Sequence, residues 1–565
     1  MKFVFISGGV LSGLGKGITT ASIGLLLKSR GIKVTAVKCD MYLNVDAGTM
    51  NPVEHGEVFV THDGLETDQD LGHYERFLNE TLNENSYLTN GLIYKVVLEK
   101  ERALEYDGIC VQPYHHIPPE IIKRLENAGK DHNADVVLVE LGGTVGEYEG
   151  LLFFEAIRRL KLRSPDDVIL VHVGYLPAPP SIGELKSKPL QQSVSYIHSL
   201  GLHPDIIVGR AEKVVDIKRK EKIALASGVN VEDVISNPDV ESIYEVPLIL
   251  EKQSIATKIM KKLKLKPRKP DLNKWKIMVD MVKKAENKVK IVIVGKYQKT
   301  GDYTLEDSYV CVIEALKHAG WNFGVLPEIT WIDSGELEQM NKDEVKEKLS
   351  SADGIIVPQG WGKRGTEGKI KAAQYARENN VPYLGLCFGM QMASIEFGRN
   401  VVGLSSANTQ EINPKTKHPV IHIMPNQKEY LKKKQYGGTI RLGAWPCVIK
   451  KGSKLEEAYA KYGNGLKSAW YQINSKSLSS AAPKKASLVY ERHRHRYEFN
   501  HKYRKQYEGK GFVISGTSPD GKLVEAIEVK DHPFFVGTQF HPEYLSRPLA
   551  PHPIFMSFVK ACLKA

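Results

Sequence analysis

The chain has 565 residues, which is too long for one ordinary domain and predicts two to four domains of roughly 100–200 residues each. Hydrophobic residues make up 42% and charged residues 25%, a composition that excludes a mainly disordered protein. The net charge of +12 favours anionic partners such as nucleotides, although a solvated lysine-rich surface explains the charge more simply.

Cysteine usage and hydropathy indicate the cellular setting. Six cysteines are scattered along the chain without a CxxC pair, so neither a disulfide scaffold nor a zinc ribbon is supported. The first residues read as a strand without a signal sequence, and no run approaches the roughly 18 apolar residues of a membrane span. We therefore expect a reduced, cytoplasmic protein with no membrane partner.

The first third of the chain alternates buried strands with helices. Apolar residues recur at helical spacing over residues 20–29 and Gly31 follows, so we expect a helix there. Expected strands cover residues 2–6, 33–38, 136–140, 168–173 and 205–209. Continuous apolar strands between helices predict a parallel sheet that is covered on both faces.

A second series of strands and helices follows a linker that is rich in basic residues. Residues 261–269 have the composition of a linker, and a charged helical segment at 273–287 follows them. We then expect strands from residue 289 and at 354–358, 383–386 and 534–539, with short strands and loops in the lysine-, glycine- and serine-rich stretch 407–490. The predicted fold class is α/β, with two domains that are each a mostly parallel sheet with helices on both faces, and a boundary near 270–289.

A glycine-rich loop lies between the first strand and the first helix. Residues 7–17 read SGGVLSGLGKG, in which small residues let backbone amides turn inward and Lys16 adds a charge beside the positive end of the helix dipole. The strict P-loop pattern fails at Val10, in place of glycine, and at Gly17, in place of serine or threonine. We expect a phosphate site here rather than a plain glycine-rich turn, with Lys38 facing the same crevice.

Asp70 and Glu140 are candidate ligands for the magnesium ion that accompanies a nucleoside triphosphate. Glu140 ends a buried strand, where a carboxylate faces the ligand crevice of an open α/β sheet and is costly without a partner. Asp70 taken alone reads more simply as a solvated loop acid. Mg²⁺ takes one or two carboxylates together with phosphate oxygens, which matches this pair.

The second half contains a nucleophile-elbow pattern around Cys387. A predicted strand runs into GLCFGMQ, whose flanking glycines permit a sharp turn with the thiol at its tip. The backbone N–H of Phe388 is expected to help bind an oxyanion, while His541 would act as base and Glu543 would orient it. A core thiol and a loop His-Pro-Glu are the alternatives, but their joint occurrence at two strand ends favours Cys-His-Glu catalysis.

An aromatic and basic run, ERHRHRY at residues 491–497, permits two interpretations. It reads as a nucleic-acid patch, but a single short run without a matching fold is weak support. An arginine that binds a carboxylate is equally allowed.

With these two sites, the chain resembles the CTP synthase family over essentially its whole length. The N-terminal half is similar to the family's amidoligase domain in SGGVLSGLGKGITTASIG, YLNVDAGTMNPVEHGEVFVTHDGLETDQDLGHYERF and VELGGTVGEYEG. The C-terminal half is similar to a class I glutamine amidotransferase in GLCFGMQ, ERHRHRYE and QFHPE. The resemblance implies a P-loop-like amidoligase domain at 1–270, a linker helix at 271–288 and a glutamine amidotransferase domain at 289–565.

The resemblance also implies a reaction and its regulation. ATP phosphorylates O4 of UTP, glutamine is hydrolysed through a thioester on Cys387, and the released ammonia travels inside the protein to the activated C4 to give CTP. Mg²⁺, activation by GTP, feedback inhibition by CTP, a homotetramer and the ability to form filaments are implied as well. No nucleic-acid partner is expected.

Site residues are carried over from the family position by position. Those implied for ATP are Gly13, Leu14, Gly15, Lys16, Gly17, Ile18 and Asp70, with Lys38 on the phosphates and Asp70 and Glu140 on magnesium. Those implied for UTP or CTP are Ser12, Glu147, Tyr148, Glu149, Lys186, Ser187, Lys188, Pro189, Leu190, Gln191 and Lys222. Those implied for glutamine are Gly360, Phe388, Gly389, Met390, Gln391, Glu411 and Arg496. Two family histidines near the ammonia route or the synthetase site correspond to His55 and His116.

The chain departs from the family pattern at several turns. Met41 replaces the usual proline, Gln359 and Trp361 replace a glycine and a phenylalanine, and Phe388 replaces a leucine. If the turn at Gln359 needs a positive φ to aim its amide at the oxyanion, a non-glycine residue there is strained by about 1–2 kcal/mol. On that premise we expect a relaxed turn, and Gln359→Gly should raise glutaminase activity.

Two other functions are weighed against this one. A different amidoligase fused to an amidotransferase, such as a cobyrinic-acid amidating enzyme, is disfavoured by the run HGEVFV followed by DLGHYERF. A non-catalytic, filament-forming homologue is disfavoured because Lys16, Asp70, Glu140, Cys387 and His541 are all intact.

Overall fold

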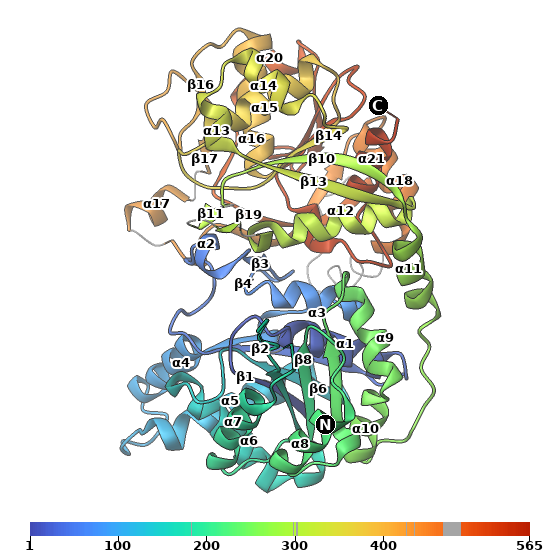
Figure 1. Cartoon of the computed structure of the whole chain (residues 1–565). Helices are drawn as coiled ribbons and strands as arrows, with labels where there is room; N and C mark the ends of the chain where they lie inside the picture. The colour runs from blue at the N-terminus through green and yellow to red at the C-terminus, as the bar shows by residue number, and fades with distance from the viewer. Residues whose placement is uncertain are drawn as a thin grey trace. The chain divides into compact units, whose positions relative to one another are not determined.

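The structure is a computed structural model and describes every residue except 182, 298, 301, 302, 305, 425, 426, 434, 435, 467–486 and 565. The chain divides into two units (Figure 1). The first comprises Met1–Ala47 and Asp70–Val279, and the second comprises Gly48–Gln69 and Asp280–Ala565. The second unit is therefore built from two separate stretches of chain, one of which lies early in the sequence.

The first unit is built on a parallel sheet, as the sequence pattern predicts. Among its described residues, seven strands lie in the order β5-β2-β6-β1-β7-β8-β9, and each neighbouring pair is parallel. Their bounds are β1 Lys2–Gly9, β2 Val34–Asp40, β5 Tyr87–Thr89, β6 Val136–Leu141, β7 Val168–Tyr175, β8 Ile206–Ala211 and β9 Val234–Pro238. Strands β1 and β7 run further than expected because their ladder continues through Ser7, Gly8 and Gly9.

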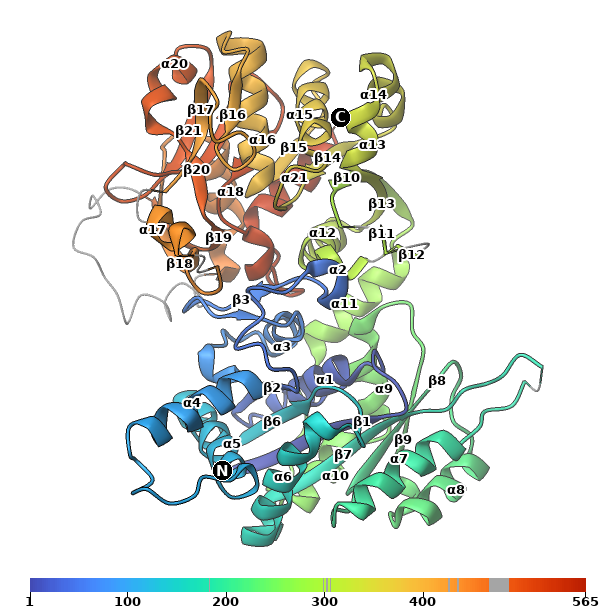
Figure 2. The ribbon, with the colours of Figure 1, turned by 90° about the vertical axis from the view of Figure 1, so that its left-hand side faces the viewer.

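Helices cover both faces of this sheet (Figure 2). On one face, Phe3 and Phe5 of β1 share a core with Phe153 and Ile157 of α6, and on the other face α1 packs against α3 and α9. The bounds are α1 Lys16–Lys28, α3 Asp70–Leu78, α4 Asn90–Arg102, α5 Pro113–Asp131, α6 Leu151–Arg163, α7 Lys188–Ser199, α8 Ile217–Ser227, α9 Val246–Lys252 and α10 Ile255–Lys262. Helix α1 begins earlier than expected, because a left-handed Gly15 turns the chain directly into the helix.

The second unit contains a sheet with a parallel half and an antiparallel half. In the described part of this unit, nine strands lie in the order β13-β10-β14-β15-β23-β22-β21-β18-β19. Pairs from β13 to β23 are parallel, and pairs from β23 to β19 are antiparallel. Their bounds are β10 Asn287–Gly295, β13 Val325–Asp333, β14 Gly354–Val357, β15 Tyr383–Leu386, β18 Arg441–Ile449, β19 Ser487–His495, β21 Phe512–Thr517, β22 Val524–Val529 and β23 Phe535–Thr538. The sequence pattern predicts the parallel half, whereas most of the antiparallel strands lack a continuous apolar run.

Helices also cover both faces of the second sheet, with α12 and α21 in one core and α15 and α16 in the other. Helix α11, Asn273–Lys284, begins in the first unit and ends in the second. The bounds of the other helices are α12 Val310–Asn322, α13 Ser334–Gln339, α14 Lys342–Leu349, α15 Thr366–Glu378, α16 Phe388–Phe397, α17 Gln427–Lys432, α18 Lys454–Tyr462, α20 Arg504–Glu508 and α21 Pro553–Cys562. Smaller elements of this unit are α2 Pro52–His55, β3 Phe59–Val60, β4 Glu66–Thr67, β16 Ala407–Thr409, β17 His418–Ile423 and β20 Tyr497–Phe499. None of the helices within the described ranges combines the length and apolar character that a membrane crossing requires.

Two expectations for the second unit need correction. Stretch 407–490 holds more regular structure than short strands and loops, since β18 and α18 each span nine residues, while residues 467–486 lie outside the described part. The run at 491–497 is not a basic surface patch. Glu491, Arg492 and His493 of β19 are fully buried, and His495 is buried as well.

Candidate active sites

The predicted phosphate loop connects β1 to α1. Gly13 and Gly15 have φ values of 71° and 78°, in the left-handed region that glycine adopts without strain. Val10 also has a positive φ, of 86°, which costs a β-branched residue about 1–2 kcal/mol. The departure from the P-loop pattern at Val10 is therefore a strained position of the loop.

Four predicted residues of the first unit converge beside this loop. Lys16, the first residue of α1, is buried, and its Nζ donates a hydrogen bond to the carbonyl of Gly143. Nζ of Lys38 on β2 contacts the Asp70 carboxylate and lies 3.1 Å from Oε1 of Glu140. Burial lowers the pKa of Lys16, because its ammonium group is removed from water. Two lysines and two carboxylates thus meet at the carboxyl ends of neighbouring strands.

Glu140 is enclosed in this cluster. Burial and the nearby charge of Asp70 raise the pKa of Glu140 to about 7, against the opposing effect of Lys38. The hydroxyl of Tyr74 donates a hydrogen bond to Glu140, and a carboxylate oxygen of Asp40 lies 3.9 Å from Nζ of Lys38. Sequence reasoning missed Tyr74 and Asp40, because neither residue stands at a motif position that marks it.

The cluster fits a magnesium ion chemically. Its carboxylates are hard oxygen donors, the type that Mg²⁺ prefers. Asp70 and Glu140 repel each other, and this repulsion raises the pKa of Glu140. A bound divalent cation would neutralise their negative charge. A Cβ at Gly17 would lie 2.1 Å from Oδ1 of Asp70, so the Asp70 carboxylate would have to move to admit the serine or threonine of the P-loop pattern.

The residues implied for UTP or CTP mostly follow the carboxyl ends of neighbouring strands. They are Ser12 after β1, residues 147–149 after β6 and residues 186–191 after β7. Glu147 accepts a hydrogen bond from the backbone N–H of Thr144 at 3.0 Å, and Tyr148 is 87% exposed. Lys222 differs from the rest because it lies on the exposed side of α8, inside a helix.

The two family histidines belong to different units. His55 is in the second unit, where its Nε2 lies 3.5 Å from Oδ2 of Asp68. His116 is a half-buried residue near the start of α5, with its ring edge-on to Tyr106. The structure thus does not bring His116 into the cluster around Lys38.

In the second unit, Cys387 lies at the predicted elbow, between the end of β15 and the start of α16. Its φ of 51° and ψ of −100° are strained for a non-glycine residue. Gly389 permits the tight packing behind the turn, because a Cβ there would lie 1.8 Å from the carbonyl oxygen of Val357. The Cys387 thiol is 5% exposed and accepts a hydrogen bond from Nε2 of Gln539 at 3.5 Å.

His541 and Glu543 follow the neighbouring strand. Strand β23 pairs in parallel with β15, so the His-Pro-Glu turn and the elbow leave the sheet at the same edge. Nδ1 of His541 is 2.7 Å from Oε1 of Glu543. Burial alone lowers the pKa of His541, but the charges of Glu543 and Cys387 outweigh it and raise the pKa to about 10. The carboxylate of Glu543 therefore favours the charged form of the imidazole.

The turn after β14 lies against the start of α16. Nζ of Lys296 is 4.1 Å from the centre of the Phe388 ring and donates to the carbonyl of Gly362 at 2.6 Å. Nζ of Lys369 donates to the carbonyl of Pro358 at 2.6 Å and lies over the same ring. Burial lowers the pKa of Lys296 to about 8. Neither buried lysine is marked by a sequence motif.

The strain expected at Gln359 is not found. The described non-glycine residues with a positive φ do not include Gln359, so its backbone does not call for a glycine. Instead, Nε2 of Gln359 donates a hydrogen bond to Oε1 of Glu57 at 2.7 Å. The backbone of Gln359 is thus unstrained, as it would be in a relaxed turn, and the expected gain of glutaminase activity in Gln359→Gly stays a prediction that the hydrogen bond to Glu57 opposes.

The residues implied for glutamine differ in how they are engaged. Glu411 accepts a hydrogen bond from a backbone amide of the turn at 2.7 Å, and burial raises the pKa of Glu411. Gln391 donates to a backbone carbonyl at 2.9 Å, while Gly360 and Met390 are buried. The Arg496 guanidinium donates to side chains of α17 and the following loop at 3.0 and 2.9 Å.

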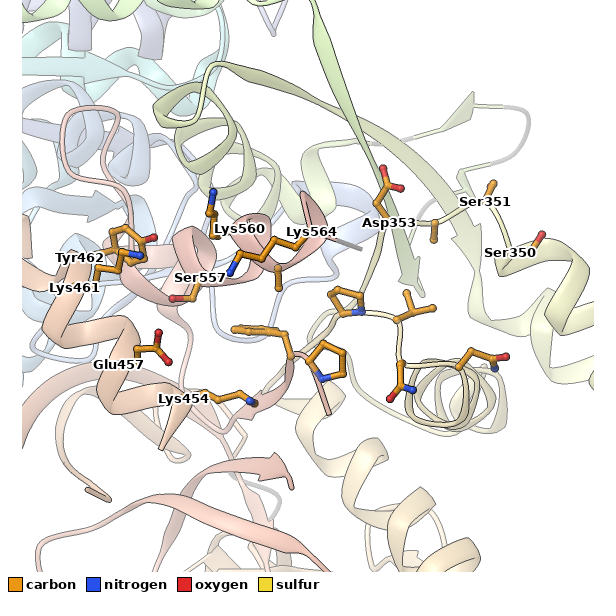
Figure 3. A pocket seen from close by; sticks show the side chains of 18 residues that line it. Ser350, Ser351, Asp353, Lys454, Glu457, Lys461, Tyr462, Ser557, Lys560 and Lys564 are labelled. Atoms are coloured by element: carbon orange, nitrogen blue, oxygen red, sulfur yellow. The ribbon is translucent and has the colours of Figure 1, made fainter. Parts of the chain in front are cut away.

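A hollow of roughly 750 Å³ lies elsewhere in the second unit (Figure 3). Its basic side chains are Lys454 and Lys461 of α18, Lys560 of α21 and Lys564, which follows α21. Its lining within the described residues does not include Cys387, His541 or Glu543. The size of a hollow therefore does not identify the site around Cys387. That site is distinguished by its strained backbone and its buried ionisable groups.

The fold and the two clusters define a class: a two-unit α/β protein with a phosphate loop in one unit and an amidotransferase-type Cys-His-Glu elbow in the other. The family profile described as "CTP synthase N-terminus" matches residues 2–265, and "Glutamine amidotransferase class-I" matches residues 304–561. The chain belongs to the CTP synthase family, and the resemblance found in the sequence is confirmed.

Individual relatives match along their whole length. CTP synthase of Caldanaerobacter subterraneus subsp. tengcongensis is 51% identical over 563 residues, which cover 100% of this chain and 98% of the relative. CTP synthase of Carboxydothermus hydrogenoformans is 50% identical over 564 residues, which cover 100% and 99%. A solved glutaminase domain of Trypanosoma brucei CTPS with bound acivicin is 38% identical, covers 49% of this chain and 94% of its own, and has a TM-score of 0.41.

Proposed function

We propose that the chain catalyses the ATP-dependent amination of UTP to CTP, with glutamine as the nitrogen donor. The observation that carries this proposal is the occurrence of two chemically complete clusters in one chain, the lysine–carboxylate cluster around Lys38 and the Cys387 elbow. A phosphate site alone or a glutaminase alone would need only one of them. A ligase that generates its own ammonia needs both.

In the proposed first step, ATP phosphorylates O4 of UTP, so that phosphate becomes the leaving group at C4. Lys16 and Lys38 offset the charge that develops on the transferring phosphoryl group, together with the amides of the glycine-rich loop. Asp70 and Glu140 are the residues that would hold Mg²⁺, which neutralises charge on the phosphates when it is bound. Lys38 also orients both carboxylates through its contacts with them.

In the second unit, the sulfur of Cys387 attacks the amide carbon of glutamine, and the carbon–nitrogen bond breaks as the thioester forms. His541, oriented by Glu543 at 2.7 Å, gives its proton to the departing nitrogen and then takes one from the water that hydrolyses the thioester. Backbone amides of Phe388 and Gly360 stabilise the oxyanion. The ammonia then attacks C4 of phosphorylated UTP and expels phosphate.

The proposal extends to the family's arrangement and regulation. It comprises an amidoligase domain at 1–270, a linker helix at 271–288 and an amidotransferase domain at 289–565, with GTP as activator, CTP as feedback inhibitor and a filament-forming homotetramer in the cytoplasm. If nucleotides bind where subunits join, adding ATP and UTP shifts the particle to larger mass in light scattering. A mass that stays constant would count against nucleotide-driven tetramers.

Incubating the protein with UTP, ATP, Mg²⁺ and either glutamine or ammonium tests the reaction. We expect CTP with both nitrogen donors, one ADP and one phosphate for each CTP, and glutamate only with glutamine. An amidoligase for another substrate would leave UTP unchanged while it still hydrolysed glutamine. A non-catalytic homologue would leave all four compounds unchanged.

A further inference from the structure

Residues 48–69 place a buried carboxylate in the second unit. Glu57 is 3% exposed and accepts a hydrogen bond from the backbone N–H of Cys311, in the first turn of α12, at 2.6 Å. Its other oxygen accepts the hydrogen bond from Nε2 of Gln359 at 2.7 Å. Glu57 is thus anchored on a helix and holds the side chain of a residue 302 positions away.

Gln359 belongs to the turn that lies against the start of α16. Its carbonyl oxygen accepts hydrogen bonds from the hydroxyl of Tyr309 and from Nζ of Lys369, each at 3.2 Å. The peptide that carries this carbonyl also carries the N–H of Gly360. Because a trans peptide is planar, fixing the carbonyl of Gln359 also fixes the direction of the Gly360 N–H.

We propose that Glu57 and Gln359 form a positioning pair that holds the Gly360 amide in place for glutamine hydrolysis. The inference rests on the proposed glutaminase function of the Cys387 elbow. Neither side chain needs to touch the reacting atoms, since both act through the peptide between Gln359 and Gly360. A glycine at position 359 would keep the N–H donors of the turn but lose this anchor. The replacement by Gln359 is therefore an added constraint on the turn.

The second unusual residue of the turn is tied to the same stretch of chain. The guanidinium of Arg494 lies 5.7 Å from the centre of the Trp361 ring, and Nε of Arg494 is 2.8 Å from Oε1 of Glu66. Residues 48–69 therefore hold the turn twice, once through Glu57 and once through Glu66 and Arg494. Both departures from the family's usual glycine and phenylalanine take part in these contacts.

The positioning pair responds to pH through Glu57. Burial and the charge of Glu543 raise the pKa of Glu57 to about 7, while hydrogen bonds from the backbone N–H and the thiol of Cys311 and the charge of His541 lower it. Two further titratable side chains interact with its charge, Tyr309 and Tyr544. When Glu57 is protonated, its hydrogen bond with the Gln359 amide is no longer charge-assisted, and a neutral bond is about half as strong. The pair therefore weakens as the pH falls through about 7.

Gln359→Ala tests the pair, with Gln374→Ala as the matched control. Gln374, a half-buried residue of α15, makes the same kind of bond, from its Nε2 to Oε1 of Glu378 at 2.9 Å, but this bond is exposed to solvent. Loss of one hydrogen bond to a charged group predicts that kcat for glutamine hydrolysis falls about tenfold in Gln359→Ala, with a smaller change in KM and unchanged ammonium-dependent CTP formation. The same kcat in both variants would overturn the proposal.

A double-mutant cycle separates a pair from two independent contacts. If Glu57 and Gln359 act only through each other, adding Glu57→Ala to Gln359→Ala lowers kcat by less than about twofold more. Losses that multiply to roughly a hundredfold would contradict the pairing. Labelling of Cys387 by a glutamine-analogue inactivator reports in each variant that the second unit is folded.

The pH profile separates positioning from a merely structural role. Glutaminase kcat of the wild-type protein should fall between pH 8 and pH 6, and the fall should be largely absent in Glu57→Gln, which has no charge to lose. In Gln359→Ala the midpoint of the pH dependence of kcat should move to higher pH, because the variant lacks the amide donor that favours the charged form of Glu57. The same profile in all three proteins would overturn the inference. Wild-type protein that releases no glutamate at any pH would instead refute the proposed function.

Discussion

Replacing Gly17 by alanine tests the geometry of the phosphate site. A Cβ at Gly17 would lie 2.1 Å from Oδ1 and 2.7 Å from Cγ of Asp70, whereas ordinary contacts begin near 3.4 Å. The carboxylate must therefore move by about 1 Å, and misplacement on that scale costs on the order of 100-fold in rate. The movement also breaks the contact between Asp70 and Lys38. We expect ammonium-dependent CTP formation to fall about 100-fold.

The same substitution should leave the fold intact. Gly17 is the second residue of α1, where alanine is favoured over glycine by up to about 1 kcal/mol, and the clash involves only the end of the Asp70 side chain. Glutamine hydrolysis at Cys387 serves as an internal control and should stay within twofold of the wild-type rate. Ammonium-dependent synthesis at the wild-type rate would refute the placement of Asp70 against the loop.

Three further substitutions probe the clusters one at a time. Lys16→Ala should lower CTP formation with either nitrogen donor by about 10³-fold, because the positive charge beside the transferring phosphoryl group is lost. A glutamine-analogue inactivator should still label Cys387 in this variant, and loss of labelling would contradict the assignment. Gly389→Ala should abolish glutaminase activity and lower the melting temperature, because its Cβ would lie 1.8 Å from the carbonyl of Val357, and normal activity would rule out that packing. The pKa of Lys296 is about 8 in the folded chain and 10.5 in the ordinary case. Between pH 8 and pH 10.5 the folded chain therefore binds fewer protons than the unfolded chain, so its stability increases as the pH rises. The free energy of unfolding in urea, relative to Lys296→Met, should therefore increase by about 2 kcal/mol from pH 8 to pH 9.5, and a pH-independent difference would refute the burial of a charged lysine.

Turns and strands that are set by residues close together in the sequence could be predicted. The loop before Lys16 and the elbow at Cys387 are short turns between a strand and a helix, and backbone geometry demands small residues around them. The parallel strands are continuous apolar runs because both of their faces are buried. These local requirements are why both clusters could be named before their geometry was known.

Contacts between distant residues could not be predicted in the same way. Tyr74 is 66 positions from Glu140, and Gln359 is 302 positions from Glu57, so no local pattern links either pair. Lysines usually lie at the surface, and the buried position of Lys296 depends on carbonyls of a turn that is remote in sequence.

The run at 491–497 misleads for a related reason. Most of its charged side chains are buried because they bind partners far along the chain: Arg492 donates to the carbonyl of Val60 at 2.9 Å, and the half-buried Arg494 donates to Glu66 at 2.8 Å. A run of basic residues resembles a surface patch only while those partners are unknown. The carboxylates that pair with such a run are therefore as informative as the run itself.

Ammonia released at Cys387 is proposed to supply the amination of UTP at a separate site. Cys387→Ala separates the two sites when CTP formation is measured with glutamine and, separately, with ammonium. We expect glutamine-dependent formation to drop to background, because no thioester can form, while ammonium-dependent formation stays within about twofold of the wild-type rate. Equal loss with both nitrogen donors, or CTP formation from glutamine that survives the substitution, would contradict it.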